Sequence, residues 1–419
     1  MLRMKIEYKG NYMHRTRAVF KILSSVILFI FLFSACSSLP KMYFEQLQLT
    51  SDERVVFNQK VFDAAWMKVN RKYFDPTFNG KDWVKLGDKY RAEAIFAADT
   101  DQLYAVINKL LGELGVSHLI AVRTARKDIT SSSKKKGAIG IMLGFLDDKA
   151  CISAVFPNSP ASKAGVQKGW LVAGRDGKKY SKGNNEFFYT IAGEPVTFDF
   201  LDQYNQLHSL RMIPVRQNKL QFVEARELDN GFLYLRLDTF NRRSVKLLRK
   251  KLEEHISTKG VILDLRTNPG GNSFYCQVAA GQFFPDTVEM GNNVTRKGRE
   301  REEKSVDFLT LDFDKPMVVL TSSRSASAAE IFSHILQFHH RAAIVGQKTA
   351  GAVLSARKYR LPDGGEIMVP VSDYIGLNGE RLEGAGVTPD REVPAATLAE
   401  IRAGKDRDIE IALEILSNN

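Results

Sequence analysis

Cysteine is scarce in this chain of 419 residues, which contains only Cys36, Cys151 and Cys276. So few cysteines in a chain of this length exclude a small fold held together by disulfides. Cys151 and Cys276 lie in apolar runs, so we expect two buried thiols and no disulfide between them. The seven histidines lack the spacing of a zinc site, since His339 and His340 are adjacent and have no partner motif. We therefore expect neither a metal nor another cofactor.

Long apolar runs are also missing. The apolar stretch "ILSSVILFIFLF" at 22–33 is short of the roughly 20 residues that a membrane-spanning helix needs. Basic residues precede it and "FSAC" ends it at Cys36, a pattern typical of a secretory signal. It resembles a bacterial lipoprotein signal, which implies a signal peptide at 1–35, cleavage before Cys36 and a lipid on the Cys36 sulfur. The alternative is a signal cleaved elsewhere, with Cys36 incidental, and translation could start at Met1 or Met13.

No basic stripe with interleaved aromatic residues accompanies the net charge of +12. The run "SSSKKKG" at 131–137 is predicted to be a solvated linker, so no nucleic-acid partner is expected. The hydrophobic content of 44% and charged content of 26% are typical of globular proteins. The chain is long enough for two or three domains.

The spacing of apolar residues changes along the chain, and the changes suggest the domain boundaries. Helical spacing fills 58–114 and a strand is expected at 117–125. Short strands with Gly and Pro between them follow, and then strands alternate with helices, which favours a sheet with parallel pairs and ligand chemistry at its carboxyl ends. The expected segments are a tether at 36–57, a helical domain with a histidine strand at 58–125, a β-domain at 135–222, an alternating domain at 231–396 and a C-terminal helix at 397–419.

The stretch "LTSSRSASAAEIFSHILQ" at 320–337 reads as the end of a buried strand, a run of small hydroxyl residues and then a helix. Ser327 and the Ala328 N–H would lie at the helix N-terminus, whose partial positive charge suits a developing oxyanion. The alternative is that Ser325 or Ser327 only caps the helix, with Glu330 as the reciprocal capping residue. This stretch alone favours the cap.

A second oxyanion donor could come from the glycines that follow the neighbouring strand, in "DLRTNPGG". Glycine allows close backbone approach, so the N–H of Gly270 or Gly271 is a candidate. A Gly-Gly turn is weak evidence when it is taken alone.

Four motifs occur in order, and together they resemble the C-terminal-processing, or tail-specific, serine peptidase family. They are "GVILDLRTNPGG" at 260–271, "SASAAE" at 325–330, "RAAIVGQKTAG" at 341–351 and "EGAGVTPD" at 383–390. The resemblance implies an α/β (α+β, multi-domain) fold with a crotonase/Clp-type-like β/α core and a small N-terminal helical domain. It also implies that Ser327 is the nucleophile.

The segment "GAIGIML" at 137–143, followed by "PNSPASKAGVQKG" at 157–169, resembles a permuted bacterial PDZ domain inserted in this core. In such a domain an exposed strand edge pairs with an extended peptide, and backbone amides hold its terminal carboxylate. The edge falls on Ala138, Ile139, Gly140 and Ile141. The alternative is a β-domain without a ligand, serving as a spacer or lid.

The proton acceptor distinguishes two branches of the family. The bacterial processing branch uses a lysine, whose place here is taken by Ala352, and Lys348 is four residues too early. The tricorn-core-like branch uses Ser-His-Glu with a helper serine. The stretch "GELGVSHLIAV" fits that pattern, and the resemblance then implies that His118 is the base and Ser117 the helper. A lone histidine would more often be structural.

An acidic partner for the histidine is expected in "RLEGAGVTPDREV". There the resemblance implies Glu383, acting through Ser117 to orient His118, while Asp390 would cap a turn. We therefore predict a serine-type endopeptidase of the bacterial cell envelope, lipid-anchored on the periplasmic face, that cleaves extended peptide or protein substrates. The alternatives are a catalytically weak PDZ scaffold and a crotonase-like acyl-handling enzyme. Oligomeric state is left open.

Overall fold

The computed structural model of the chain describes residues 49–123, 136–146, 149–181, 185–216, 220, 223–228, 230–306 and 311–418. The chain divides into two units, Met1–Thr50 and Ser51–Asn419, and the fold described below belongs to the second. The signal peptide, Cys36 and most of the expected tether and linker lie outside the described residues.

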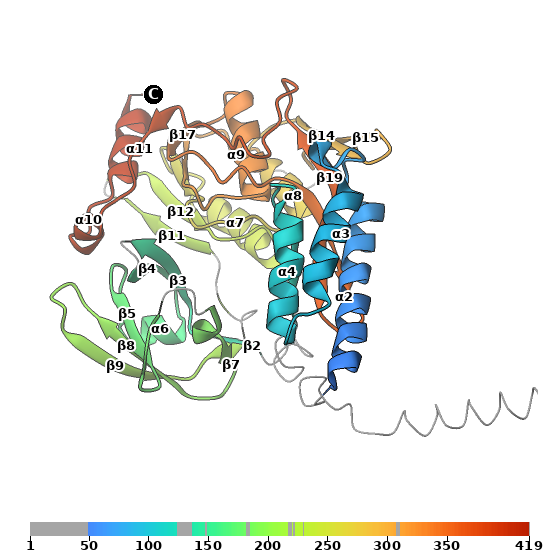
Figure 1. The fold of residues 1–419 in the computed structure, drawn as a ribbon. Coiled ribbons are helices and arrows are strands. Elements are labelled where there is room, and N and C mark those ends of the chain that lie inside the picture. The colour runs from blue at the N-terminus through green and yellow to red at the C-terminus, as the bar shows by residue number, and fades with distance from the viewer. Residues whose placement is uncertain are drawn as a thin grey trace, which may run out of the picture. The chain divides into compact units, whose positions relative to one another are not determined.

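Three helices form the first part of the second unit: α2 (Ser51–Lys72), α3 (Trp83–Ala94) and α4 (Thr100–Gly112). Their apolar faces share one core with residues of a distant hairpin (Figure 1). Asp82 and Asp99 cap α3 and α4 by accepting backbone N–H bonds. Helix α2 begins inside the stretch that was expected to be tether, because acidic residues in its first turn favour a helix start.

A five-stranded antiparallel sheet connects these helices with the second half of the chain. It consists of β1 (Ile120–Val122), β14 (Glu289–Thr295), β15 (Glu300–Lys304), β18 (Ser355–Arg360) and β19 (Glu366–Ile375). Strand β1 pairs with β19, with Ile120 opposite Met368. It is shorter than the strand predicted at 117–125, because the chain turns at His118, whose φ is 58°.

Two antiparallel sheets follow, and we call the described residues between 136 and 216 the β-segment. One sheet contains β2 (Lys136–Ala138), β7 (Thr190–Ile191) and β10 (Val215–Arg216). The other contains β3 (Ile141–Leu146), β4 (Lys149–Val155), β5 (Leu171–Arg175), β6 (Lys178–Lys179), β8 (Val196–Leu201) and β9 (Leu207–Met212), and β3 lies at its edge. Two short helical turns, α6 (Pro160–Lys163) and η4 (Asn185–Phe188), complete the β-segment, which has a core of its own.

A six-stranded sheet forms the centre of the remaining chain, in the order β11-β12-β13-β16-β17-β20. Its strands are β11 (Val223–Glu227), β12 (Leu233–Leu237), β13 (Val261–Asp264), β16 (Met317–Thr321), β17 (Ala343–Gly346) and β20 (Arg391–Glu392). Only the β11–β12 pair is antiparallel. The predicted sheet with parallel pairs, and with it the mixed α/β class, is confirmed.

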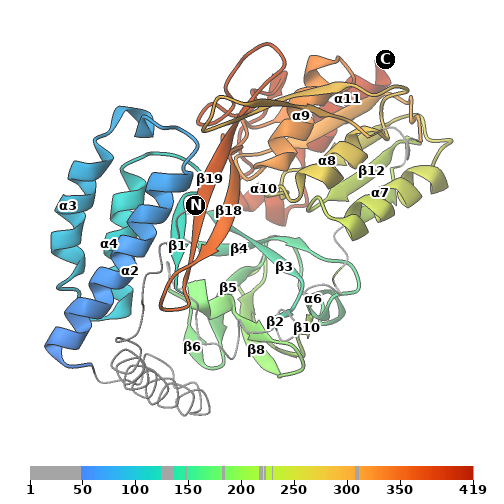
Figure 2. The same cartoon turned by 90° about the vertical axis from the view of Figure 1, so that its right-hand side faces the viewer.

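Helices cover both faces of this sheet, which explains why its central strands are apolar throughout. Helices α7 (Arg242–Glu254), α8 (Ser273–Ala280) and α9 (Ala328–Phe338) share one core with one face (Figure 2). Helix α11 (Arg407–Ser417) packs on the other face. The tail forms two helices and not one, because Gly404 adopts a left-handed φ of 71° between α10 (Leu398–Arg402) and α11.

Two further points concern the described ranges as a whole. None of the helices there combines the length and apolarity that crossing a bilayer requires. Cys151 and Cys276 are both free and buried, as predicted from their apolar surroundings.

Candidate active site

The turn between β16 and α9 holds Ser327 in a backbone conformation that non-glycine residues rarely adopt, with φ of 56° and ψ of −121°. Such a conformation costs roughly 1–3 kcal/mol and persists only where neighbours fix it. A strained turn from strand to helix is also how other serine hydrolases expose a nucleophile. The strain is unnecessary for a helix cap, so it favours a chemical role for Ser327.

Ser325 has a structural role in the same turn. Its hydroxyl is fully buried and donates to the Leu265 carbonyl at 2.8 Å. The Ala326 N–H donates to the Asn268 carbonyl at 3.1 Å. These bonds fix the turn to the chain that follows β13, whereas the Ser327 side chain is only half-buried. Of the two candidate serines, Ser327 is therefore the one available for chemistry.

Two backbone amides are candidate oxyanion donors, one in this turn and one in the loop that follows β13. Ala328 is the first residue of α9, and Gly271 lies in the loop after β13. Within the described residues, the N–H groups of these two residues donate to no other group. The Gly270 N–H, by contrast, donates to Asn268 Oδ1 at 2.8 Å. Gly270 instead provides close approach, because a Cβ there would lie 2.7 Å from the Ser327 Cβ. Of the two predicted glycines, the geometry favours Gly271 as donor.

Glu330, expected only to cap the helix, connects two loops of the site. Its carboxylate is fully buried and accepts the Ser327 N–H at 2.9 Å. It also accepts the Thr349 hydroxyl and the Gly351 N–H, both at 2.6 Å, and the Ala352 N–H at 2.8 Å. A buried carboxylate needs such partners to offset its desolvation. Ala352, at the position of the family's lysine, therefore belongs to a loop whose amides bind the Glu330 carboxylate. Lys348 is exposed.

Ser117, His118 and Glu383 form a hydrogen-bonded chain, although Glu383 lies 266 positions from Ser117. The Ser117 hydroxyl is 2.8 Å from His118 Nδ1 and donates to Glu383 Oε2 at 2.9 Å. The Ser117 N–H donates to Glu383 Oε1 at 2.7 Å. The carboxylate therefore positions the serine, and the serine positions the imidazole. This leaves Nε2 as the ring nitrogen to accept a proton.

The carboxylates of Glu330 and Glu383 accept hydrogen bonds from the backbone amides of two consecutive residues. Glu330 accepts the Ala352 N–H, and Glu383 accepts the next one, from Val353, at 2.9 Å. Burial lowers the pKa of His118, while the negative charges of Glu383 and Glu330 oppose that shift. Glu330 thus raises the pKa of His118 through its charge, and the same carboxylate accepts the Ser327 N–H. A histidine with a lowered pKa is neutral at pH 7 and able to accept a proton.

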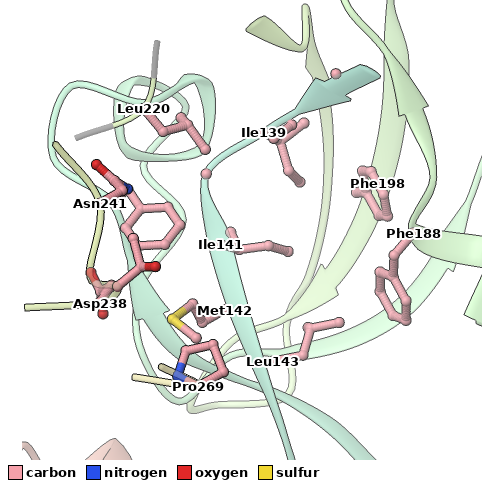
Figure 3. A pocket seen from close by; sticks show the side chains of 15 residues that line it. Ile139, Ile141, Met142, Leu143, Phe188, Phe198, Leu220, Asp238, Asn241 and Pro269 are labelled. Carbon is pink, nitrogen blue, oxygen red and sulfur yellow. The ribbon is translucent and has the colours of Figure 1, made fainter. Parts of the chain in front are cut away.

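A pocket of about 740 Å³ lies along the edge of the β-segment. It is lined by residues 137–143 and, from the six-stranded-sheet part of the chain, by Asp238, Thr239, Asn241 and Pro269. Figure 3 shows β3 running between Phe188 and Phe198 on one side and Asp238, Asn241 and Pro269 on the other. All four residues predicted as the peptide-binding edge, Ala138, Ile139, Gly140 and Ile141, line this pocket.

Sequence reasoning missed several residues of these sites. Arg324 donates to the Leu143 carbonyl at 2.8 Å and to the Ser153 hydroxyl at 3.1 Å, so it joins the turn between β16 and α9 to the β-segment. Asp238 lies in the pocket wall, where burial raises its pKa although Arg236 opposes the shift. The only signal for Arg324 was its position three residues before Ser327. Within the described ranges, no three potential ligands gather to hold a metal ion.

Comparisons with known proteins identify related families and folds. Residues 231–393 match the model of "Peptidase family S41", and residues 58–112 match that of "Tricorn protease C1 domain". A carboxyl-terminal-processing protease of a Synechocystis species is 27% identical over 86% of this chain and 87% of its own. One from a Picosynechococcus species is 25% identical over 86% and 90%. The solved photosystem II D1 C-terminal processing protease has a TM-score of 0.58 at 22% identity, covering 86% of this chain and 97% of its own.

Proposed function

From its peptidase family S41 domain at 231–393 and its tricorn protease C1 domain at 58–112, which make the chain a serine-type peptidase, we propose that it cleaves extended polypeptides. In this proposal Ser327 is the nucleophile and His118 is the base. The observation that carries the proposal is the hydrogen-bonded chain from Glu383 through Ser117 to His118 Nδ1. It supplies a base where the lysine of the processing branch is replaced by Ala352.

The first chemical step forms the acyl-enzyme. His118 Nε2 takes the proton of the Ser327 hydroxyl while Oγ attacks the carbonyl carbon of the substrate. The Ala328 and Gly271 N–H groups bind the oxyanion, each worth roughly 3–4 kcal/mol in comparable enzymes. When the tetrahedral intermediate collapses, the C–N bond breaks and His118 gives its proton to the leaving amine.

The second step releases the acyl group. His118 takes a proton from water as the water attacks the ester carbonyl. When the intermediate collapses, the C–O bond to Ser327 breaks and His118 gives that proton to the Ser327 oxygen, which restores the hydroxyl. Ser117 and Glu383 touch no substrate in this scheme. They are positioning residues that keep the His118 ring oriented through both steps.

The β-segment serves in this proposal as a PDZ module that recruits substrate by its free C-terminus. Neither the Ile139 N–H nor the Gly140 N–H donates to a group within the described residues, and Gly140 has a φ of 84°. Successive free amides in such a turn form a nest for a carboxylate. The apolar side chains of the pocket would take the last side chains of the peptide.

The lipid anchor on Cys36 is part of the proposal as well. The apolar stretch at 22–33 followed by "FSAC" supports it. An anchored peptidase of this kind would act at the bacterial cell envelope, on the periplasmic face. Peptide and protein substrates and the lipid bilayer are then its partners.

Labelling with a fluorophosphonate probe, with peptide present, tests the nucleophile and the base. We expect Ser327→Ala to abolish labelling, and both Ser327→Ala and His118→Ala to lower kcat/KM by at least about 10³-fold. The half-buried Ser355→Ala and the exposed His340→Asn are matched controls that should keep wild-type rates.

Three outcomes would count against the assignment. Labelling that persists in Ser327→Ala excludes this serine as nucleophile. Labelling that is lost in Lys348→Ala but retained in His118→Ala restores the lysine dyad. A wild-type chain that binds peptide but neither labels nor cleaves would support the PDZ scaffold instead.

A further inference from the structure

Strand β18 continues directly from the loop that binds both carboxylates of the candidate site. The Ala352 and Val353 N–H groups donate to Glu330 and Glu383, and β18 begins two residues after Val353. The strand forms a hairpin with β19, and the apolar faces of α2, α3 and α4 pack on one face of that hairpin (Figure 2). Because Glu330 also accepts the Ser327 N–H, a polypeptide that lies along β18 is directed towards the nucleophile.

The outer edge of β18 is open. At the end of the hairpin, the Leu361 N–H donates to the Gly365 carbonyl at 2.8 Å. Hydrogen-bonded and non-hydrogen-bonded pairs alternate in an antiparallel ladder, so the main-chain groups of Lys358 and Arg360 point away from β19. Within the described residues, none of these groups has a hydrogen-bond partner. An edge of this kind can accept another extended chain.

The strand on the other side of β19 is protected from such pairing. There β1 pairs with β19, and the Asn108 side chain lies against the outer side of β1. Its Nδ2 donates to the Ala121 carbonyl and its Oδ1 accepts the Ala121 N–H, both at 2.8 Å. The amide takes the place of a paired strand at this residue. Of the two strands that flank this part of β19, β18 is therefore the one that another chain can join.

The charge of β18 indicates what kind of chain would join it. The strand carries three exposed bases, Arg357, Lys358 and Arg360, and no acid. Glu366 lies opposite Arg360 in the register, but within the described residues no carboxylate forms an ion pair with any of the three. Side chains directly opposite each other on paired strands have Cβ atoms about 4.5–5.5 Å apart. A strand added to β18 would thus place alternate side chains beside Lys358 and Arg360, where carboxylates are favoured.

We propose that β18 is a docking strand for the substrate, and that Lys358 and Arg360 select a segment with acidic side chains at alternate positions. The occupant is an extended part of the polypeptide on one side of the scissile bond. Main-chain hydrogen bonds and the two cations bind it. This inference rests on the proposed function. It adds a substrate class, namely acidic extended chains, that the catalytic residues by themselves would not select.

A different interpretation of the same bases is that they keep β18 from pairing with a second copy of the chain, as lysines do on many edge strands. The two interpretations differ in what they predict for substrates. Docking predicts a preference for acidic peptides, since an exposed ion pair raises affinity about 1.5- to 5-fold and is weakened by salt. Protection of the edge predicts no such preference and predicts self-association when the bases are removed.

Quenched fluorescent peptides test the preference. All share one cleavage sequence and one free C-terminus, and on either side of the scissile bond they carry Glu, Gln or Lys at two alternate positions. With the wild-type full-length chain, we expect the two Glu residues on one side to raise kcat/KM about 2- to 25-fold over Gln, and two Lys residues to lower it. The ratio should approach one in about 1 M NaCl, where the Debye length is about 3 Å.

Charge reversal locates the effect on β18. The double variant Lys358→Glu/Arg360→Glu should prefer the Lys peptides over the Glu peptides, a change that loss of folding would not produce. Lys297→Glu/Arg299→Glu is the matched control, since it reverses two exposed bases at the same spacing in the turn between β14 and β15. The control should keep the wild-type order of the three peptides.

N-methylated peptides test the main-chain contacts without any change to the protein. Methylation removes an amide donor, and each lost hydrogen bond should lower kcat/KM about 2- to 12-fold. We expect this loss at every second residue of the acidic segment and a smaller loss at the residues between, because only alternate amides of an added strand face β18.

Equal kcat/KM for the Glu, Gln and Lys peptides would overturn the inference while leaving the peptidase proposal intact. A preference for Glu that survives Lys358→Glu/Arg360→Glu would overturn it as well. A loss on N-methylation without a period of two residues would exclude strand pairing at β18 and with it the docking strand. Failure of the wild-type chain to cleave any of the peptides contradicts the proposed function itself.

Discussion

At the scale of single residues, Glu330 makes more hydrogen bonds within the candidate site than any residue predicted to do chemistry. Its buried carboxylate accepts four hydrogen bonds, from Ser327 and from the loop at 349–352. It also acts on His118 through its charge. A capping residue on the surface would have neither of these properties. The same side chain therefore fixes the turn that holds Ser327 and helps to set the pKa of His118.

The pH dependence of kcat/KM reports on this charge. Burial lowers the pKa of His118, so the acid limb of the wild-type profile should lie below the ordinary histidine pKa of about 6.5. Glu383 and Glu330 raise that pKa, so removing the Glu330 charge in Glu330→Gln should move the limb to still lower pH. The amide also loses acceptor capacity, which should cost about 1–3 kcal/mol of unfolding free energy.

Rate profiles and urea unfolding curves of Glu330→Gln, compared with the exposed Glu302→Gln, measure both effects. The control should match wild type in each measurement. A limb that stays in place, or moves to higher pH, would show that Glu330 acts on the site only through packing.

At the scale of elements, helix α11 supports the site from the opposite face of the sheet. Asp406 and Asp408, at its start, each accept from Arg266 Nη1 at 2.7 Å. Arg266 also binds Asp264, and its carbonyl accepts the Ser322 hydroxyl at 2.7 Å. The two carboxylates at the start of α11 thus hold Arg266, and the Arg266 carbonyl binds Ser322 in the turn that leads to Ser327.

Acid unfolding tests this support. Burial alone would raise the pKa of Asp406, but the hydrogen bonds and charge of Arg266 outweigh burial and lower it. Its contribution is therefore present above the unfolded pKa of about 3.9 and is lost as the pH falls through the lower, folded value. We expect Asp406→Asn to lower the unfolding free energy by about 1.5–3 kcal/mol at pH 7, with the difference from wild type shrinking in acid.

Urea unfolding of both chains at several pH values measures that difference. Glu414→Gln, an exposed change on the same helix, is the matched control and should stay within about 0.5 kcal/mol of wild type. A difference that is independent of pH would mean that the Asp406 charge does not stabilise the fold.

At the scale of the whole molecule, the proposed lipid anchor on Cys36 would attach the peptidase to a membrane. Anchoring would confine the pocket to the membrane surface, where it meets the C-termini of other envelope proteins. A dually or triply acylated chain stays on the bilayer, whereas a chain without acyl groups has only its protein surface to bind with.

Fractionation of bacteria that express the full chain tests the anchor. Wild type should sediment with membranes and incorporate radiolabelled palmitate, while Cys36→Ser should lose the label and enter the soluble fraction. Ser38→Ala is the neighbouring control. Palmitate incorporation that persists in Cys36→Ser would show that the lipid is attached elsewhere or that the signal is cleaved at another site.

Much of the fold could be predicted from the sequence, because apolar spacing depends mainly on local geometry. The alternation of strands and helices after residue 231 predicted the parallel sheet and placed Ser327 at its carboxyl edge. Element ends were less accurate: β1 is confined to Ile120–Val122, and the tail breaks into two helices at Gly404. In both places one residue with positive φ interrupts a continuous apolar pattern.

By itself, the sequence determined the candidate nucleophile, the histidine and the acid, since each is a residue type within an ordered motif. Only the tertiary structure decided how the histidine and the acid connect through Ser117, because a hydrogen bond depends on which atoms approach in space. It brought Glu383 to Ser117 and committed the Gly270 N–H to Asn268, while the Gly271 N–H donates to no group in the described part of the chain. It also placed Pro269 in the same pocket as Gly140, from segments well over a hundred residues apart.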